Sequence, residues 1–211
     1  MLQGAKITIL VFLIVFSASI PLGFFVTLLG KSRFKPITWL VNIYITIMRG
    51  TPLILQLFFV YFALAYIPVI GPYIKLERMQ AALLAFILNY AAYFAEIFRG
   101  GLMAIDKGQY EAAKVLGFNK IQTFIHIIIP QMIRVSLPAL SNEAITLVKD
   151  TSLLYVISIA EISYVAKTAV SREASVFPLV IAGALYLLII LILTIILRFI
   201  EKKFSYASKS L

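Results

Sequence analysis

The stretch QYEAAKVLGFNKIQTFIHIIIPQ, residues 109–131, stands out from a chain that is otherwise mostly apolar. Its first part favours a helix that Gly117 is placed to end, and Asn119 can cap a second helix. We expect this second helix to reach about Ile128 and Pro130 to stop it. The stretch therefore predicts two short helices joined at a glycine, which together form a compact projecting knob.

This knob carries more apolar side chains than a solvated loop needs, namely Tyr110, Ala113, Leu116, Phe118 and Phe124. Exposed apolar surface of this kind usually meets a partner. The alternative is a helix pair that lies on the lipid surface. The one histidine, His126, falls in the second helix, where we expect a surface or docking residue.

The composition outside the knob places the chain in a lipid bilayer. Hydrophobic residues make up 62% and charged residues 13%, with a mean hydropathy of +1.01, whereas a soluble domain is nearer half apolar and a quarter charged. The chain has no cysteine and a single histidine, which excludes disulfides, thiolate metal sites and a histidine cluster within one chain. The net charge of +10 fits cytoplasmic loops better than nucleic-acid binding, since the longest basic run is KSRFK.

Five apolar segments fit membrane spans, each of which needs about 20 helical residues. They cover residues 7–30, 37–67 (interrupted by Arg49-Gly50-Thr51-Pro52), 80–98, 135–159 and 177–197. The first segment has a signal peptide as its alternative, with a cleavage site near Ser17-Ala18-Ser19, but its apolar run is too long and only Lys6 precedes it. We predict an all-α polytopic membrane protein, one transmembrane domain over 1–211 with about five transmembrane helices and a cytoplasmic loop over about 100–134.

Five spans put the termini on opposite sides, and the positive-inside rule chooses between the two orientations. With the amino terminus outside and the carboxyl terminus in the cytoplasm, thirteen basic residues lie inside, namely Lys31, Arg33, Lys35, Arg49, Arg99, Lys107, Lys114, Lys120, Arg134, Arg198, Lys202, Lys203 and Lys209. Six lie outside, namely Lys6, Lys75, Arg78, Lys149, Lys167 and Arg172. This orientation places the knob in the cytoplasm.

Two of the predicted spans carry polar stripes. In the third span, Asn89, Tyr93 and Glu96 share one helical face at i, i+4 and i+7. Asn89 precedes Arg99 by ten residues, and a rise of 1.5 Å per residue puts it roughly 15 Å from that inner end, near the middle of the bilayer.

The fourth span repeats the pattern with Glu143, Thr146 and Asp150 at i, i+3 and i+7, next to Asn142 and Lys149. Glu143 follows Arg134 at about the same distance that separates Asn89 from the inner end, so the two stripes are expected to face one another across a solute path.

Ionisable groups inside a membrane are costly, so they suggest function. Glu143 is the acid best placed to contact a solute, and Glu161 is second. The full set of candidate solute-binding residues is Glu143, Glu161, Asn89, Asn142, Tyr93 and Thr146. For Asn89 and Asn142 the alternative is hydrogen bonding that only holds the helices together. Glu96 beside Arg99 favours an ion pair or a hinge over solute contact.

Several motifs resemble those of a known family. Glu111-Ala112-Ala113, Gly117, Ile127 and Pro130 match the spacing of the EAA loop of ATP-binding cassette (ABC) importer permeases, with Ile129 where the family prefers Leu. Three further segments resemble the subfamily that imports polar amino acids of the histidine, glutamine and arginine type, and the likeness covers nearly the whole chain. These segments are Arg49-Gly50-Thr51-Pro52, residues 96–101 (EIFRGG) and residues 149–153 (KDTSL).

The resemblance implies a permease domain whose loop forms coupling helices that dock on an ATPase subunit, through Glu111, Ala112, Ala113, Gly117 and Pro130. It implies two ATP-binding subunits, a second permease subunit (an identical or a related chain), an extracytoplasmic solute-binding protein, and a bacterial or archaeal inner membrane. No cofactor is expected in this chain, because ATP and Mg would be bound by the partner ATPase. Gly30-Lys31-Ser32 completes no phosphate loop, since that motif needs glycine where Phe25 stands.

We therefore expect a permease subunit that takes up a polar amino acid by alternating access and is itself no enzyme. Acidic residues near the middle of the membrane favour a basic amino acid as the solute. The alternatives are glutamine, glutamate, methionine or an osmolyte as the solute, or a small channel or assembly factor without an ATPase partner.

Overall fold

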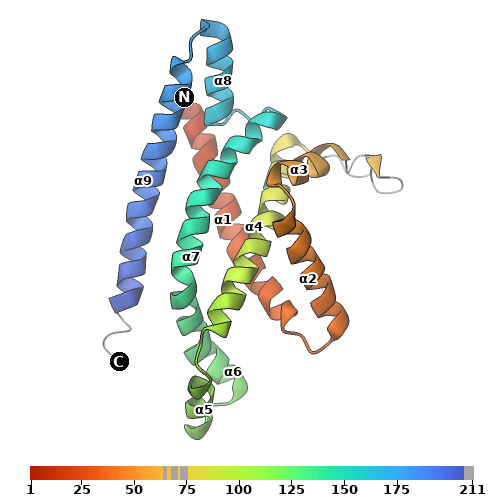
Figure 1. Cartoon of the computed structure of the whole chain (residues 1–211), viewed down its shortest axis with the longest axis vertical. Helices are drawn as coiled ribbons and strands as arrows, with labels where there is room; N and C mark the ends of the chain where they lie inside the picture. The colour runs from red at the N-terminus through yellow and green to blue at the C-terminus, as the bar shows by residue number, and fades with distance from the viewer. Residues whose placement is uncertain (64–65, 68–70, 72–75, 207–211) are drawn as a thin grey trace.

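The computed structural model describes residues 1–63, 66–67, 71 and 76–206, and Figure 1 shows an elongated bundle of helices. Lys75 and Lys209, which were counted for the orientation, lie outside the described residues. The long helices are α1 (Leu2–Gly30), α4 (Arg78–Met103), α7 (Ile129–Asp150) and α9 (Phe177–Tyr206).

The second predicted span is a bent pair. α2 (Lys35–Gly50) is followed by α3 (Leu53–Phe58) and a π-helical turn over Phe59–Ala63, and the two parts meet at 108°. Within the described residues, four helical stretches are long and apolar enough to cross a membrane, and five if this pair counts as one span. The predicted all-α fold with about five spans is confirmed.

The most extensive helix pairing joins α1 to α4. Gly23 lets the two backbones approach, because a Cβ atom at this position would lie 2.8 Å from the carbonyl oxygen of Ala91. The Thr27 hydroxyl crosses the same interface and donates to the carbonyl of Ala95 at 3.0 Å. α1 is thus packed into the bundle, which supports its interpretation as a transmembrane helix.

The buried core lies where α1, α4 and α7 meet, around Val11, Phe86, Met132 and Leu147. α9 packs against α7 and against α8 (Ile162–Glu173), while much of its apolar surface remains exposed, as expected for a helix surrounded by lipid. A short 3₁₀ helix, η5 (Thr151–Ile157), connects the end of α7 toward α8.

The loop of residues 109–131 projects from one end of the bundle, opposite the amino terminus and α8 (Figure 1). It forms α5 (Lys107–Val115) and α6 (Lys120–Gln122), and Gly117 between them has a φ of +78°, the left-handed conformation that glycine adopts at low cost. The predicted cap is present, because the Asn119 side chain accepts from the backbone N–H groups of Ile121 and Gln122.

One prediction about this loop was wrong: Pro130 does not stop the second helix. α6 continues through a π-helical segment, η4 (Thr123–Ile128), directly into α7, and Pro130 stands in the first turn of α7. The helix type changes from π to α just before Pro130, so the hydrogen-bond pattern shifts at the position where a proline lacks an N–H, and the helix continues past it.

Candidate functional site

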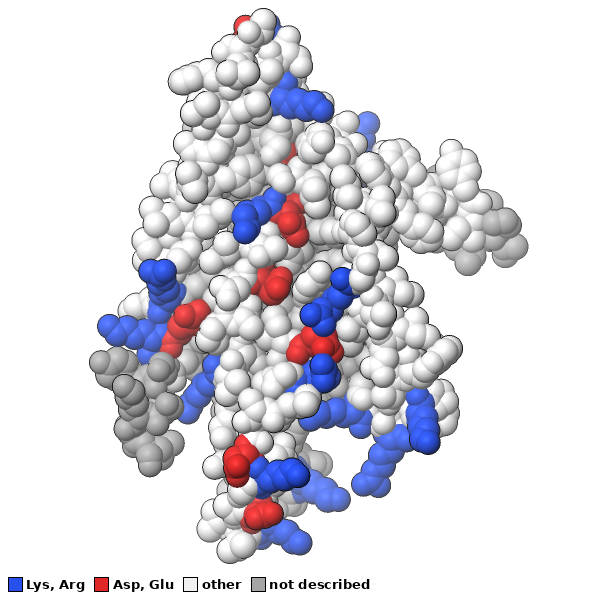
Figure 2. Space-filling model, viewed as in Figure 1, with Lys and Arg blue, Asp and Glu red and all other residues white. Residues whose placement is uncertain are grey.

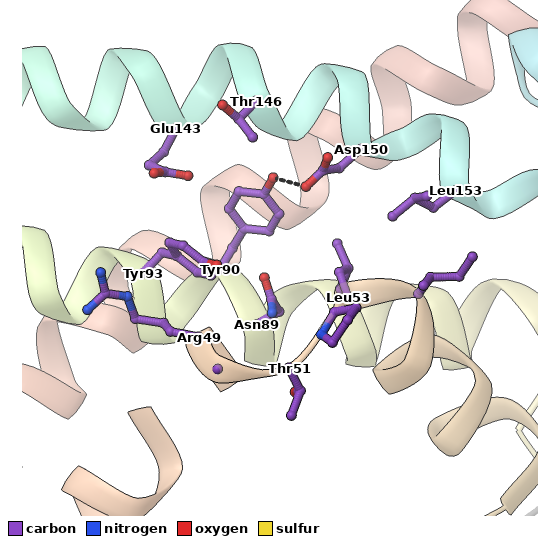
Figure 3. Close-up of a pocket in the computed structure, with 13 residues that line it drawn as sticks. Arg49, Thr51, Leu53, Asn89, Tyr90, Tyr93, Glu143, Thr146, Asp150 and Leu153 are labelled. Carbon is purple, nitrogen blue, oxygen red and sulfur yellow. Dashed lines mark hydrogen bonds between the residues drawn. The ribbon is translucent and has the colours of Figure 1, made fainter. Parts of the chain in front are cut away.

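A polar cavity of about 540 Å³ opens between the α2–α3 bend, α4 and α7 (Figure 3). The bend contributes Arg49, Gly50, Thr51, Pro52, Leu53 and Ile54, α4 contributes Asn89, Tyr90 and Tyr93, and the end of α7 with the following turn contributes Glu143, Thr146, Asp150 and Leu153. The two polar stripes predicted from the sequence therefore do face one another. Four of the six candidate solute-binding residues, Asn89, Tyr93, Glu143 and Thr146, line this one cavity.

The charges of the cavity come from different helices. Glu143 and Asp150 lie on the same side of α7, two turns apart, and Arg49 lies across from Glu143 beside the Tyr93 ring (Figure 3). The Tyr90 hydroxyl donates to the Asp150 carboxylate at 2.7 Å, which leaves the other oxygen of that group free of this contact. Among the described lining residues, Arg49 is the one base, opposite two acids. The sequence placed both Glu143 and Asp150 on this stripe but named only Glu143 as a solute contact, and the parts played by Tyr90 and Arg49 were missed.

Hydrogen bonds from the side chains of Gln56 and Asn89, which the sequence did not indicate, hold the α2–α3 bend. The Gln56 amide donates to the carbonyl oxygens of Met48 at 2.9 Å and Thr51 at 3.1 Å, which helix α2 leaves without partners at its broken end. The Asn89 amide donates to the same Met48 carbonyl and to Gln56 Oε1, each at 3.0 Å. Asn89 thus ties the bend to α4 through its nitrogen, in line with the alternative that such residues hold helices together.

Glu96 lies at one edge of this region and is paired with two arginines. Arg99 donates to both of its carboxylate oxygens, from Nε at 2.7 Å and from Nη2 at 2.6 Å. Arg49 Nη1 lies 3.3 Å from one of the same oxygens. The ion pair predicted between Glu96 and Arg99 is confirmed.

The other two candidate solute-binding residues lie elsewhere. Asn142 is exposed and does not line the cavity. Glu161 is 0% exposed and caps α8, where its oxygens accept from the backbone N–H groups of Ser163 and Tyr164 and from the Tyr186 hydroxyl, each at 2.7 Å. Burial raises the pKa of this carboxyl group, and the hydrogen bonds oppose that shift. The contacts of Glu161 are those of a structural group that joins α8 to α9.

The projecting loop presents the opposite kind of surface. Val115 is 87% exposed, Leu116 73% and Ile121 71%, with Tyr110 and Phe118 exposed beside them. Of the residues predicted for ATPase coupling, Glu111, Ala112, Gly117 and Pro130 are exposed, while Ala113 is buried and holds α5 against the rest of the loop. The Gln131 amide also donates to Gln109 Oε1 at 3.0 Å, which joins the loop to α7.

Basic side chains gather toward the end of the bundle that carries the loop, while acidic and basic side chains lie together among uncharged ones in the middle of the face in Figure 2. Lys31, Arg33 and Lys35 follow α1 at this end of the fold. Partial burial lowers the pKa of Lys31.

Comparisons with known proteins agree on one family. The family model described as "Binding-protein-dependent transport system inner membrane component" matches residues 19–206. The chain is 37% identical over 205 residues to the arginine transport system permease protein ArtQ of Bacillus subtilis, covering 96% of this chain and 91% of that protein. It is 35% identical over 203 residues to the probable glutamine ABC transporter permease protein GlnM of the same species, covering 96% of this chain and 92% of that protein.

A solved structure shows the same fold. The structure described as "Crystal structure of an amino acid ABC transporter with histidines" superposes with a TM-score of 0.87 at 32% sequence identity. The match covers 96% of this chain and 92% of that one.

Proposed function

The chain belongs to the family of binding-protein-dependent transport system inner membrane components and is a permease subunit of an amino acid ABC importer, and we propose that it takes up a basic amino acid through the cavity between the α2–α3 bend, α4 and α7. Its family, predicted from the Glu-Ala-Ala loop, is thus confirmed. An importer of this family works in the inner membrane with an ATPase and a binding protein.

One observation carries the proposed solute: the cavity opposes two carboxylates to one guanidinium. A basic amino acid carries one carboxylate and two cationic groups, so each of its charges finds an opposite one. A neutral amino acid leaves one acid without a partner, and a charge desolvated without a partner is costly. Glu143 and Asp150 are suited to the cationic groups of the solute, while Tyr93 and Thr146 offer further polar contacts around it.

The exposed apolar surface of α5 and α6 supports the proposal that this loop docks on an ATPase subunit, with Glu111, Ala112, Ala113, Gly117 and Pro130 at the contact. ATP and Mg are then bound by that partner, and this chain hydrolyses nothing. We place the loop in the cytoplasm, the amino terminus outside and the carboxyl terminus inside. The positions of the amino terminus and the loop at opposite ends of the bundle support this orientation.

A second permease subunit completes the proposed assembly. This chain does not fully enclose the cavity, and five spans are too few to surround a gated path, so a second copy or a related chain is expected beside the first. Two ATPases that close on ATP would then move two such loops together and turn the cavity from the outer to the inner face.

The experiment that tests the solute uses transporter reconstituted in vesicles with its ATPase and binding protein. Glu143→Gln removes one acid at constant size, and arginine uptake is expected to fall roughly ten- to a hundredfold, the effect of losing one charge-assisted contact. Glutamine uptake, if present, should change much less. If arginine uptake persists while glutamine uptake falls, the solute is a neutral amino acid and the proposal is wrong.

A further inference from the structure

Arg49 is the one base among the described cavity residues, and its charge is only partly committed to the protein itself. It stands at the end of α2, immediately before the break, and its side chain is 42% exposed. Its guanidinium carbon lies 5.3 Å from the centre of the Tyr93 ring, a distance at which a cation is attracted to the ring face. The side chain is therefore held at the cavity wall without being enclosed.

The ion pairs around Glu96 leave one positive charge in excess. Arg99 contacts both oxygens of Glu96 in a fork, at 2.7 and 2.6 Å, whereas Arg49 makes a single, longer contact of 3.3 Å. Forked pairs of arginine and carboxylate are the stronger arrangement. Glu96 thus stays neutralised by Arg99 if Arg49 moves away, and most of the five donors of Arg49 are available to another acceptor.

The backbone that carries Arg49 is fixed in place. Gln56 and Asn89 both donate to the Met48 carbonyl, one residue before Arg49, and Gln56 also holds Thr51, two residues after it. Movement of the guanidinium is therefore confined to its own side chain. A group held in this way loses little further conformational freedom when it binds a ligand.

We propose that Arg49 binds the α-carboxylate of the transported amino acid, exchanging its contact with Glu96 for the solute while Arg99 keeps Glu96 paired. The other charged groups of the cavity, Glu143 and Asp150, repel a carboxylate and so orient the solute with its carboxylate toward the bend. This inference rests on the proposed function only in that the solute is an amino acid, since every amino acid has this carboxylate.

The test compares arginine with agmatine, the same molecule without the carboxylate. Equilibrium binding is measured on the complete permease–ATPase complex in lipid nanodiscs, without the binding protein, so that only the membrane cavity is probed. Arg49→Gln should weaken arginine binding roughly ten- to a hundredfold, as expected for one charge-assisted contact, and should not weaken agmatine binding. Arg172→Gln is the matched control, because this arginine lies on α8 and pairs with its neighbour Glu173.

The variant Glu96→Gln is expected to change arginine binding in the opposite direction to Arg49→Gln. It removes the carboxylate that competes for Arg49, so arginine binding should be retained or tightened. If Arg49→Gln and Glu96→Gln weaken arginine binding alike, or if Arg49→Gln weakens arginine and agmatine by the same factor, Arg49 only supports the fold and the inference is wrong. Unchanged arginine binding in Arg49→Gln also overturns it.

Two further outcomes are covered by the same design. If the Arg49→Gln complex does not assemble, Arg49→Lys is used, because it keeps the positive charge but loses the two-pronged guanidinium. Weaker binding of arginine with unchanged binding of agmatine then supports the inference.

If the wild-type complex binds glutamine and not arginine, the basic-solute proposal fails. The test of Arg49 is then made with glutamine and 4-aminobutanamide, its counterpart without the carboxylate, and equal weakening of the two overturns the inference.

Discussion

The cavity and the projecting loop are both mismatched to their surroundings, in opposite senses. In the cavity, Glu143, Asp150 and Arg49 place charges between membrane helices, while on the loop Val115 and Leu116 expose apolar side chains at the end of the bundle. The cavity charges are partly satisfied by the protein, through Tyr90 and Glu96. The loop residues have no such internal compensation among their described contacts, which is the behaviour expected of a surface that a second protein covers.

The exposure of a polar side chain helps to distinguish a residue that can contact a solute or partner from one that only stabilises the fold. Glu161 is also an acid within a mostly apolar chain, but all of its contacts are internal and it is fully buried. Glu143 is half-buried and faces the cavity. Residues that combine a mismatch with exposure are the ones to test for partners.

The largest effect is expected on the loop side, from Gly117→Asp. Gly117 has a left-handed backbone that aspartate can adopt at moderate cost, so the change mainly adds a charge to the docking surface. Transport in reconstituted vesicles should fall roughly thirtyfold or more, as for a residue central to an interface, while membrane insertion is retained. Gly117→Asn is the control, because it has the same shape without the charge and should be milder. Unchanged transport in Gly117→Asp would contradict a docking role.

A smaller effect should separate apolar exposure to a partner from apolar exposure to lipid. Leu116 on the loop and Leu187 on α9 are 73% and 70% exposed. Leu116→Ala should weaken association with the ATPase subunit roughly tenfold, measured by co-purification at increasing dilution, because it removes contact area at an interface. Leu187→Ala should leave association unchanged. Equal effects of the two changes would mean that the exposed loop is not distinguished from the lipid-facing surface.

On the cavity side, Gln56→Ala tests the hydrogen bonds that hold the α2–α3 bend. It removes donors to the carbonyls of Met48 and Thr51 and should lower the free energy of unfolding by about 1 kcal/mol. The Michaelis constant for solute should rise several-fold while the turnover number changes less, because the bend carries Arg49. Gln3→Ala, at an exposed position near the start of α1, provides a glutamine control for stability. A stable variant with unaltered Michaelis constant would show that the bend does not position the cavity.

The smallest effect on solute binding is expected from Glu161→Gln. The amide retains one acceptor and loses the other, so the cap on α8 is weakened by about 1 kcal/mol, which thermal unfolding in detergent would detect. Arginine binding should remain within about twofold of the wild type, because Glu161 does not contact the solute and its replacement removes no solute contact. A large loss of arginine affinity with normal stability would instead support the solute-binding role that the sequence predicted.

Much of the site was predictable because helical periodicity assigns residues to a face. Asn89 and Tyr93 on one helix, and Glu143 and Thr146 on another, were placed on common faces by spacing alone, and the structure brings these faces together. The fixed spacing of the Glu-Ala-Ala loop likewise identified the family. Arg49 was named in the charge count and in the Arg-Gly-Thr-Pro segment but not as a cavity residue, because spacing within one helix does not tell which other helix lies beside it.

The sequence by itself determined that the chain spans a membrane, roughly where its long apolar helices run, and which loop carries an exposed apolar surface, because hydropathy and capping are local properties of neighbouring residues. Only the tertiary structure decided that α2 and α3 meet at 108°, that Gln56 and Asn89 secure this bend, and that Glu161 is a buried cap. It also decided that Pro130 lies within a continuous helix. The physical reason is that these features depend on hydrogen bonds and packing between segments far apart in the chain, or on a change of helix type that the local pattern does not show.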